Sequence, residues 1–295
     1  MKAQTAIIVL NWNGWRDTAE CAAALLAGNR QDFRIVVVDN GSTDGSVVQL
    51  QERFGDRIDI LPLKENRGFA RGNNAGIRYA LDRFDPAYII LLNNDTLAGD
   101  DFPAPLIAVL AHDPAAGLAA PRVLDLPGKR FWQKPIVRRF GFWSYLLLAT
   151  PLYHLTARLV RLNLRQPSRV YAVPGCALCF RRAALEQIGL LDEQTFLGSE
   201  EYIVAEKLRR AGLFTYFAPD STINHLVGRS TAQVGQTVKA GAFLRSERYL
   251  LTEYYRFGFW RRLAIRLVRL SLYAARLWPR GAFREWLQIA GGTAI

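Results

Sequence analysis

Apolar and polar positions alternate in blocks along the first third of the chain. Short aliphatic runs, each about the length of one buried strand, stand at residues 5–10, 34–38, 58–63 and 87–92. Mixed polar and apolar stretches between and after these runs predict helices over residues 17–27, 45–54 and 75–84. Strands and helices that take turns in this way are typical of the α/β class, with a mostly parallel central sheet and helices on both faces.

The pattern changes in the second half of the chain. Residues about 125–168 contain few acidic side chains and many arginine, lysine and aromatic ones, and we interpret them as an insertion that leaves the main sheet. From residue 235 to the end the sequence is typical of helices, so we divide the chain into a domain of residues 1–234 and a C-terminal helical region of residues 235–295. Between these parts we expect a strand over 171–180, helices over 182–188 and 200–211, and a last short strand over 214–217.

Polar clusters follow two of the aliphatic runs, at the points where the predicted strands end. Asp39 precedes a Gly-Ser-Thr turn, and Asn93, Asn94 and Asp95 follow a later run. Ligands of open α/β sheets bind beyond the carboxyl ends of the strands, so these side chains are expected at one crevice. Asp39 can accept hydrogen bonds from a nucleoside, and the oxygens of the second cluster suit a hard divalent cation that shares substrate phosphates. Each cluster taken alone is equally typical of a turn.

Two further segments carry candidate chemistry. Residues 66–74 are rich in glycine and asparagine, and we expect a loop in which Arg67 or Arg71 could meet a phosphate, although the Lys-Ser/Thr of a P-loop is absent. Glu200 and Glu201 open a predicted helix. There they either favour the helix dipole or supply a general base.

Histidine and cysteine are scarce, with three of each. His225 precedes residues 228–231, a run suited to phosphate, although a single histidine is more often structural. Cys176 and Cys179 form a C-x-x-C without the second pair that a zinc site needs, and we interpret them as small buried hydrophobic residues. So few cysteines fit a protein of a reducing compartment.

The chain carries a net charge of +12, which implies nucleic acid, a membrane surface or a phosphorylated substrate as an anionic partner. Many arginines gather in residues 131–165 and 256–286, with tryptophan, phenylalanine, tyrosine and leucine between them. We favour a basic amphipathic surface on anionic lipid over helices that pack on their own domain. No nucleic-acid partner is expected, because no reader motif is recognised. No apolar run reaches the length of about twenty residues that a transmembrane helix needs, and the N-terminal run does not resemble a signal peptide.

Taken in order, these motifs resemble those of the inverting family 2 glycosyltransferases, which have the nucleotide-diphospho-sugar transferase fold known as GT-A. The resemblance spans roughly residues 4–231, and the sequence looks most similar to the bacterial rhamnosyltransferase-like branch. The motifs that carry it are residues 7–14, 37–44, 66–70, 73–76, 91–96, 175–180, 188–193, 200–201 and 225–230.

The resemblance implies a role for each candidate residue. Asp39 would bind the nucleotide base, while Asp95 and His225 would lie at a Mg²⁺ or Mn²⁺ ion on the diphosphate. Glu201, or alternatively Glu200, would be the catalytic base. By the same resemblance the nucleotide-sugar site comprises Asn11, Asp39, Asn66, Gly68, Arg71, Asn74, Asn93 and Asn94, and the acceptor side comprises Gly175 and Cys176.

The implied activity is transfer of a sugar from a nucleotide-diphosphate donor to a hydroxyl of a glycan or polyprenyl-linked acceptor, in the synthesis of a cell-surface polysaccharide such as lipopolysaccharide. For the rhamnosyltransferase-like branch the donor would be dTDP-rhamnose. The expected location is cytoplasmic and peripheral, on the cytoplasmic face of the bacterial inner membrane. Two alternatives are a nucleotidyltransferase-like enzyme and a catalytically degenerate, membrane-bound scaffold. A nucleotidyltransferase would have a basic Gly-rich loop after the first strand, where this chain has residues 11–14, Asn-Trp-Asn-Gly.

Overall fold

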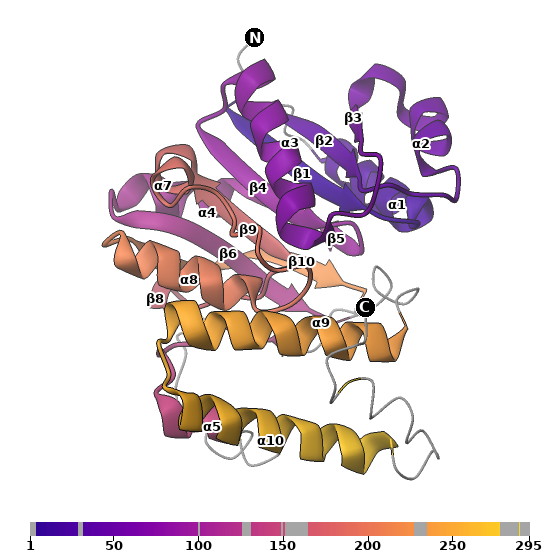
Figure 1. Ribbon diagram of the computed structural model, residues 1–295. Helices are drawn as coiled ribbons and strands as arrows, with labels where there is room; N and C mark the ends of the chain where they lie inside the picture. Colours follow the sequence, from indigo (N-terminus) through magenta and orange to yellow (C-terminus); the bar gives the residue numbers. More distant parts are fainter. Residues whose placement is uncertain are drawn as a thin grey trace.

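The aliphatic runs form the first strands of one sheet (Figure 1). The computed structural model describes residues 4–28, 32–99, 101–125, 131–148, 150, 165–226, 235–277 and 289. The strands begin and end within one residue of their predicted bounds. β1, β2 and β4 are largely buried and leave a clear apolar signal, whereas the edge strand β3 is only partly buried. The elements of this half are β1 (Thr5–Asn11), α1 (Trp15–Ala27), β2 (Phe33–Asp39), α2 (Ser46–Phe54), the 3₁₀ turn η1 (Gly55–Arg57), β3 (Asp59–Pro62), α3 (Gly68–Phe84) and β4 (Tyr88–Asn93).

The second half of the chain completes the sheet. Its strands are β5 (Thr96–Ala98), β6 (Ala116–Leu124), β7 (Phe131–Gln133), β8 (Ser168–Val170), β9 (Ala177–Arg181) and β10 (Phe214–His225). Its helices are α4 (Pro103–His112), α5 (Phe142–Leu148), α7 (Arg182–Gln187), α8 (Glu200–Arg210), α9 (Gln236–Tyr249), the π-helical η2 (Leu250–Tyr254) and α10 (Phe259–Leu277).

The described strands form a ten-stranded mixed sheet in the order β3-β2-β1-β4-β9-β6-β10-β5, with β7 on β6 and β8 on β10. The ladders from β3 to β4 and the ladder between β6 and β10 are parallel, and they contain most of the paired residues. β9 runs antiparallel between β4 and β6 and joins the two parallel parts. The expected α/β class with a mostly parallel sheet is therefore confirmed.

Helices cover both faces of the sheet because alternate strand residues point to opposite sides. Ile7 and Val37 belong to the apolar cluster that includes α1, α2 and α4. Ile8 and Val38 belong to the cluster that includes α3, α7 and α8. The carboxyl ends of β1, β2 and β4 remain between these two helical layers, and the candidate residues lie there.

Helix α3 begins at Gly68, so the expected loop over residues 66–74 is wrong from that residue onward. A Cβ on Gly72 would lie 2.6 Å from Leu10 Cδ1, and a Cβ on Gly76 would lie 2.5 Å from Ile8 Cγ2. The glycines therefore let α3 approach β1 closely. This packing outweighs their poor helix propensity, on which the loop prediction depended.

Two strand predictions also need correction. β10 does not stop at residue 217 but continues to His225, since a register shift between Ala218 and Thr222 accommodates Pro219. In the predicted strand over 171–180, regular pairing begins at Ala177, and the preceding part contributes an isolated bridge from Ala172. β5 and β6 were not predicted from the sequence.

The C-terminal helices lie beside α8 and, in Figure 1, below the sheet, with α9 between α8 and α10. A third apolar cluster joins them to part of the basic segment, since Tyr145 of α5, Ile203 of α8, Leu250 and Ile265 pack together. Ion pairs support this contact, among them that of the partly exposed Arg139 with the fully buried Glu206. Expectations that fall on residues 126–130, 149, 151–164, 227–234, 278–288 and 290–295 lie outside the described residues.

Candidate active site

The ends of β1 and β2 are joined by a buried carboxylate. Asn11 and Asp39 are register partners, and the Asn11 amide donates a hydrogen bond of 2.8 Å from Nδ2 to Asp39 Oδ2. The backbone N–H of Ser42 donates to Asp39 Oδ1 at 2.9 Å. Asp39 is 2% exposed, so its carboxylate is fixed in place by the protein before any ligand arrives.

A threonine that the sequence analysis missed extends this network. The Thr18 hydroxyl of α1 donates to Asn11 Oδ1 at 2.7 Å and accepts from Asn94 Nδ2 at 3.0 Å. All three side chains are buried. The signal that could have revealed Thr18 is its place on α1, four residues after Gly14, whose carbonyl it also contacts. Asn11, Thr18, Asp39 and Asn94 thus form a polar floor beneath the strand ends.

Asn40 fixes the turn that leads into α3. Its Nδ2 donates to Asn66 Oδ1 at 3.0 Å, and its Oδ1 accepts from the backbone N–H of Arg67 at 3.0 Å. Gly68 follows with a φ of +80°, and a Cβ there would lie 2.5 Å from the carbonyl oxygen of Phe196. This turn is therefore pressed against the segment that precedes the two glutamates.

Asn74 and Arg71 use their polar groups within the protein. The Asn74 amide donates to the Leu191 carbonyl at 2.9 Å and to Glu193 Oε1 at 2.8 Å, and it accepts from the Leu191 N–H at 3.1 Å. Arg71 Nε donates to the Glu193 carbonyl at 3.1 Å, while its side chain stays exposed. Both residues attach α3 to residues 191–193, and Arg71 also lies at the surface.

Asp95 and His225 meet where β5 begins and β10 ends. His225 Nε2 lies 3.1 Å from Asp95 Oδ1, and both side chains are buried. The strand pairing of Thr96 with His225 and the hydrogen bond from the Leu226 N–H to the Asp95 carbonyl at 2.8 Å hold them together. His225 Nδ1 is buried and has no hydrogen-bond partner within the described part of the chain.

This pair fits a Mg²⁺ or Mn²⁺ site of limited protein ligation. No group of three or more histidine, cysteine or acidic side chains that could hold a metal occurs among the described residues. Asp95 Oδ1 and His225 Nε2 are two potential metal-ligand atoms that lie 3.1 Å apart. Ions of this kind keep several waters and bind through one or two carboxylates together with substrate phosphates, so a full protein cage is not required.

Glu200 and Glu201 occupy the first turn of α8, after Gly198 and Ser199, which both have positive φ. Burial, followed by the charge of Glu201, raises the pKa of Glu200 to about 8. Burial also raises the pKa of Glu201, which its own N–H offsets in part. Oε1 of Glu200 is buried without a hydrogen-bond partner among the described residues, although some surface of both side chains remains accessible.

Cys176 is near enough to both acidic sites to be affected by the charges of Asp95 and Glu201. Burial raises the pKa of its thiol to about 12, and the charges of Asp95 and Glu201 both contribute. Its carbonyl accepts a hydrogen bond of 2.9 Å from the N–H of Asn93. Gly175, its neighbour, is partly exposed. The structure thus gathers Asn93, Asp95, Cys176 and Glu201 around one end of the sheet, while Asp39 lies beyond β1.

A buried carboxylate at the ends of β1 and β2, an Asp–His pair and a glutamate pair at the start of α8 form an arrangement suited to group transfer from a phosphorylated donor. The solved structure of GalNAc-T7 with UDP, GalNAc and Mn²⁺ has a similar fold. Its TM-score is 0.62 at 17% identity, over 85% of this chain and 48% of that one, so the chain spans about half the length of this neighbour.

The chain belongs to the family described as glycosyl transferase family 2, whose family model matches residues 6–189. It is 26% identical over 222 residues, 72% of each chain, to an N-acetylglucosaminyl-diphospho-decaprenol L-rhamnosyltransferase of Mycobacterium tuberculosis. It is 21% identical over 209 residues, 69% of this chain and 63% of the relative, to a dTDP-rhamnosyl transferase, RfbF, of Shigella flexneri. The resemblance to family 2 inferred from the sequence is confirmed.

Proposed function

We propose that this glycosyltransferase moves a sugar, rhamnose from dTDP-rhamnose, onto a hydroxyl of a glycan or polyprenyl-linked acceptor in the synthesis of a cell-surface polysaccharide, with inversion at the anomeric carbon. The observation that carries the proposal is the buried Asp95–His225 pair, 3.1 Å apart, two residues from Asn93, whose N–H donates to the Cys176 carbonyl. The charges of Asp95 and Glu201 both act on the Cys176 thiol and support its nearness to the proposed base. The names of two relatives, both rhamnosyl transferases, support the choice of sugar.

Asp39 and Asn11 would hold the nucleoside, since they lie at adjacent strand ends in the buried polar floor. Asn66 and Gly68 would border the same pocket through their contacts with Asn40 and Phe196. Asp95 and His225 would hold Mg²⁺ or Mn²⁺. Such an ion supplies positive charge against the departing diphosphate.

Glu201 would act as the base. Its carboxylate accepts the proton of the acceptor hydroxyl, whose oxygen forms a bond to the anomeric carbon as the bond to the diphosphate oxygen breaks. The electron pair of that bond leaves with the nucleotide. A raised pKa suits Glu201 to this role, because a base is most effective when its pKa lies near the working pH. One displacement inverts the configuration and needs no covalent intermediate.

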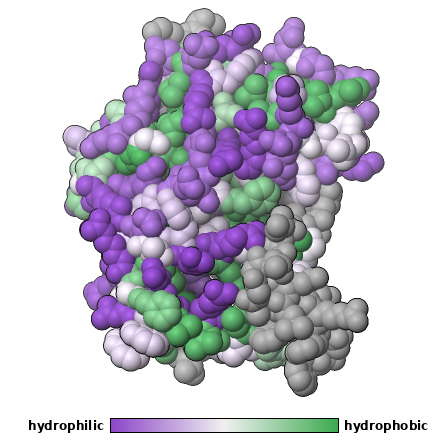
Figure 2. All heavy atoms as spheres, viewed as in Figure 1, coloured by the Kyte–Doolittle hydropathy of each residue, from purple (hydrophilic) through white to green (hydrophobic). Residues whose placement is uncertain are grey.

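We also propose that the enzyme rests on the cytoplasmic face of the bacterial inner membrane. Trp143 of α5 and Trp260 of α10 are 74% and 77% exposed, and Arg261 lies 5.6 Å from the ring of Phe142. Figure 2 shows hydrophobic and hydrophilic side chains side by side in the lower part of the molecule, where α5 and α10 lie. Exposed indoles among arginines suit the interface of an anionic bilayer. Within the described residues, no helix meets the length and hydropathy needed to cross a membrane.

Turnover of dTDP-, UDP- and GDP-sugars, with and without Mn²⁺, tests the proposed activity. We expect Asp95→Ala and Glu201→Gln each to lose transfer without unfolding the protein. Glu52→Gln, on the exposed side of α2, is the matched control for loss of a carboxylate. Wild-type turnover in Glu201→Gln would assign the base to Glu200. Absence of both turnover and stabilisation by any nucleotide would favour the degenerate scaffold.

A further inference from the structure

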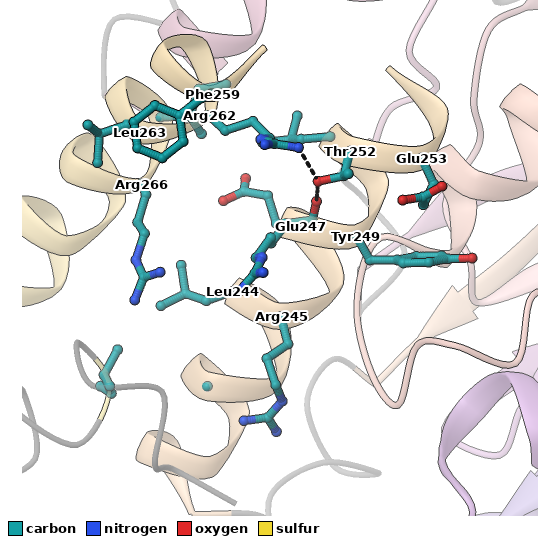
Figure 3. A pocket seen from close by; sticks show the side chains of 15 residues that line it. Leu244, Arg245, Glu247, Tyr249, Thr252, Glu253, Phe259, Arg262, Leu263 and Arg266 are labelled. Carbon is teal, nitrogen blue, oxygen red and sulfur yellow. Dashed lines mark hydrogen bonds between the residues drawn. The ribbon is translucent and has the colours of Figure 1, made fainter. Parts of the chain in front are cut away.

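A groove separate from the candidate active site lies between α9 and α10 (Figure 3). Its volume is about 930 Å³, and its walls come from both helices and from η2. Figure 3 shows Leu244 and Arg266 projecting from opposite helices toward the space between them, with Arg245 at its edge. The size is within the range of a small-molecule site, so the groove can take a ligand rather than a single ion.

The groove has an excess of positive charge. Four arginines line it, against two glutamates. Of the glutamates, Glu247 is already paired with Arg269 at 2.9 Å and also contacts the Tyr145 hydroxyl. Arg262 donates to the Thr252 hydroxyl at 2.8 Å, which holds it along the wall. The arginines are Arg245, Arg248, Arg262 and Arg266, and the second glutamate is the exposed Glu253.

The rest of the lining is largely apolar. Leu244 of α9 and Leu251 of η2 line one wall. Leu263 and Ile265 of α10 line the second wall, and Ile289 completes the lining. Arginine forks above an apolar floor match a molecule with phosphate at one end and hydrocarbon at the other. The exposed Trp260 lies on the same helix as this second wall, so the groove belongs to the region proposed to meet the membrane.

The opposite side of α9 contacts the segment that carries the glutamates. The Ser246 hydroxyl donates to the Leu197 carbonyl at 3.0 Å, and a Cβ on Gly198 would collide with the ring of Phe243. One helix, about 10 Å wide, therefore separates the groove from the start of α8, where Glu201 lies. A phosphate in the groove would be one helix width from the proposed base.

We propose that this groove binds the phosphate-bearing head of a polyprenyl-linked acceptor, with the start of its isoprenoid chain on the apolar floor. The proposal rests on the proposed function, since it names the site at which the acceptor of that reaction is held. The positive charge selects phosphate, and the apolar lining favours a lipid phosphate over a free one. The short distance to α8 favours the acceptor lipid over a phospholipid that serves as an anchor alone.

Co-flotation with phosphatidylcholine vesicles tests the groove directly. The vesicles contain a long-chain polyprenyl phosphate, or phosphatidylglycerol at matched charge, or neither. We expect the wild type to bind the polyprenyl phosphate vesicles most strongly. Arg245→Glu together with Arg266→Glu should reduce that binding about thirty-fold, because each basic side chain near an anionic lipid contributes about fivefold. The control is Arg16→Glu with Arg53→Glu, which makes the same charge change at two exposed arginines of α1 and α2, outside α9 and α10.

Equal binding to polyprenyl phosphate and phosphatidylglycerol vesicles would overturn the proposal and indicate a general anionic-lipid anchor. Wild-type binding by the groove variant would overturn it as well. If charge reversal lowers the melting temperature, Arg245→Gln with Arg266→Gln repeats the test with a milder change. Donor hydrolysis by the wild type, measured without acceptor, is the separate check on the proposed function. Hydrolysis without lipid preference refutes the groove alone, and lipid preference without turnover of any donor refutes the proposed function alone.

Discussion

Replacing Glu200 with glutamine tests whether the glutamate pair is as strongly perturbed as its environment indicates. Burial and the neighbouring charge of Glu201 raise the pKa of Glu200 from 4.5 to about 8. Between these two values the folded protein holds a proton that the unfolded chain releases. A carboxyl group with a raised pKa therefore contributes stability that is complete below the unfolded pKa and is lost as pH rises through the folded pKa.

The size of the effect follows from the shift. Each pKa unit corresponds to about 1.36 kcal/mol, so a rise from 4.5 to about 8 sets an upper limit of about 5 kcal/mol. Glu200 keeps some accessible surface, and solvent reduces the effect, so we expect about 2–4 kcal/mol. Glutamine does not titrate. The free energy of unfolding of Glu200→Gln, relative to the wild type, should therefore increase by this amount from about pH 5 to about pH 9.

Urea denaturation at the two pH values, followed by circular dichroism, measures this difference. Glu52→Gln removes an exposed carboxylate and should show almost no change between the two conditions. A difference between wild type and Glu200→Gln that is the same at both pH values would refute the argument. It would mean that Glu200 ionises as an ordinary surface carboxylate, and that the pair is more hydrated than the packing around α8 indicates.

Three further predictions concern other parts of the molecule. Gly68→Ala should lower the free energy of unfolding by about 2–4 kcal/mol because its Cβ would meet the Phe196 carbonyl. Gly45 also has positive φ but has open space around it, so Gly45→Ala should lower the free energy of unfolding by less. Urea denaturation compares the two variants. Glu206→Gln should lower the free energy of unfolding by about 1–3 kcal/mol, read by the same method, because Arg139 loses a charged hydrogen-bond partner while solvent reaches its partly exposed side chain. Trp260→Ala should weaken flotation with anionic vesicles, because the exposed indole no longer reaches the interface. Added salt should weaken the remaining binding further. Binding that does not change with salt would contradict the electrostatic part of the membrane proposal.

The sequence was sufficient to predict the β1 to β4 half of the sheet because three of its strands, β1, β2 and β4, are largely buried, and the partly buried edge strand β3 still has a short apolar run. Such strands give continuous aliphatic runs, and the bounds agree within a residue. The start of α3 was missed because Gly72 and Gly76 serve tertiary packing, which local propensity does not report. The predicted strand over 214–217 ended before Pro219 because the continuation of β10 depends on a register shift along β6, a feature of pairing between distant segments.

In the candidate site, too, features set by local sequence were predicted and features set by contacts between distant segments were not. The acidic and amide residues at strand ends were found because parallel strands bring their carboxyl ends to one edge. The contact between Asp95 and His225 depends on the pairing of β5 with β10, and β5 was not predicted. The place of Thr18 on α1, four residues after Gly14, is the one local signal of its role, and the link that its hydroxyl makes between two strand ends depends on the fold. Asn74 has the residue type of a ligand-binding position. Its amide instead donates hydrogen bonds to Leu191 and Glu193, because the fold brings residues 191–193 against α3.

Under the proposed function, in which the buried polar floor holds the donor nucleoside, the floor restricts how the donor preference can be changed. The single hydroxyl of Thr18 serves amides from two strand ends, so one substitution there leaves both Asn11 and Asn94 short of a partner. Floor residues can therefore vary only as matched sets. Thr43 and Arg71 are exposed and can change one at a time. A combinatorial library intended to redirect the enzyme to a different nucleotide sugar should keep the floor constant and randomise these outer positions.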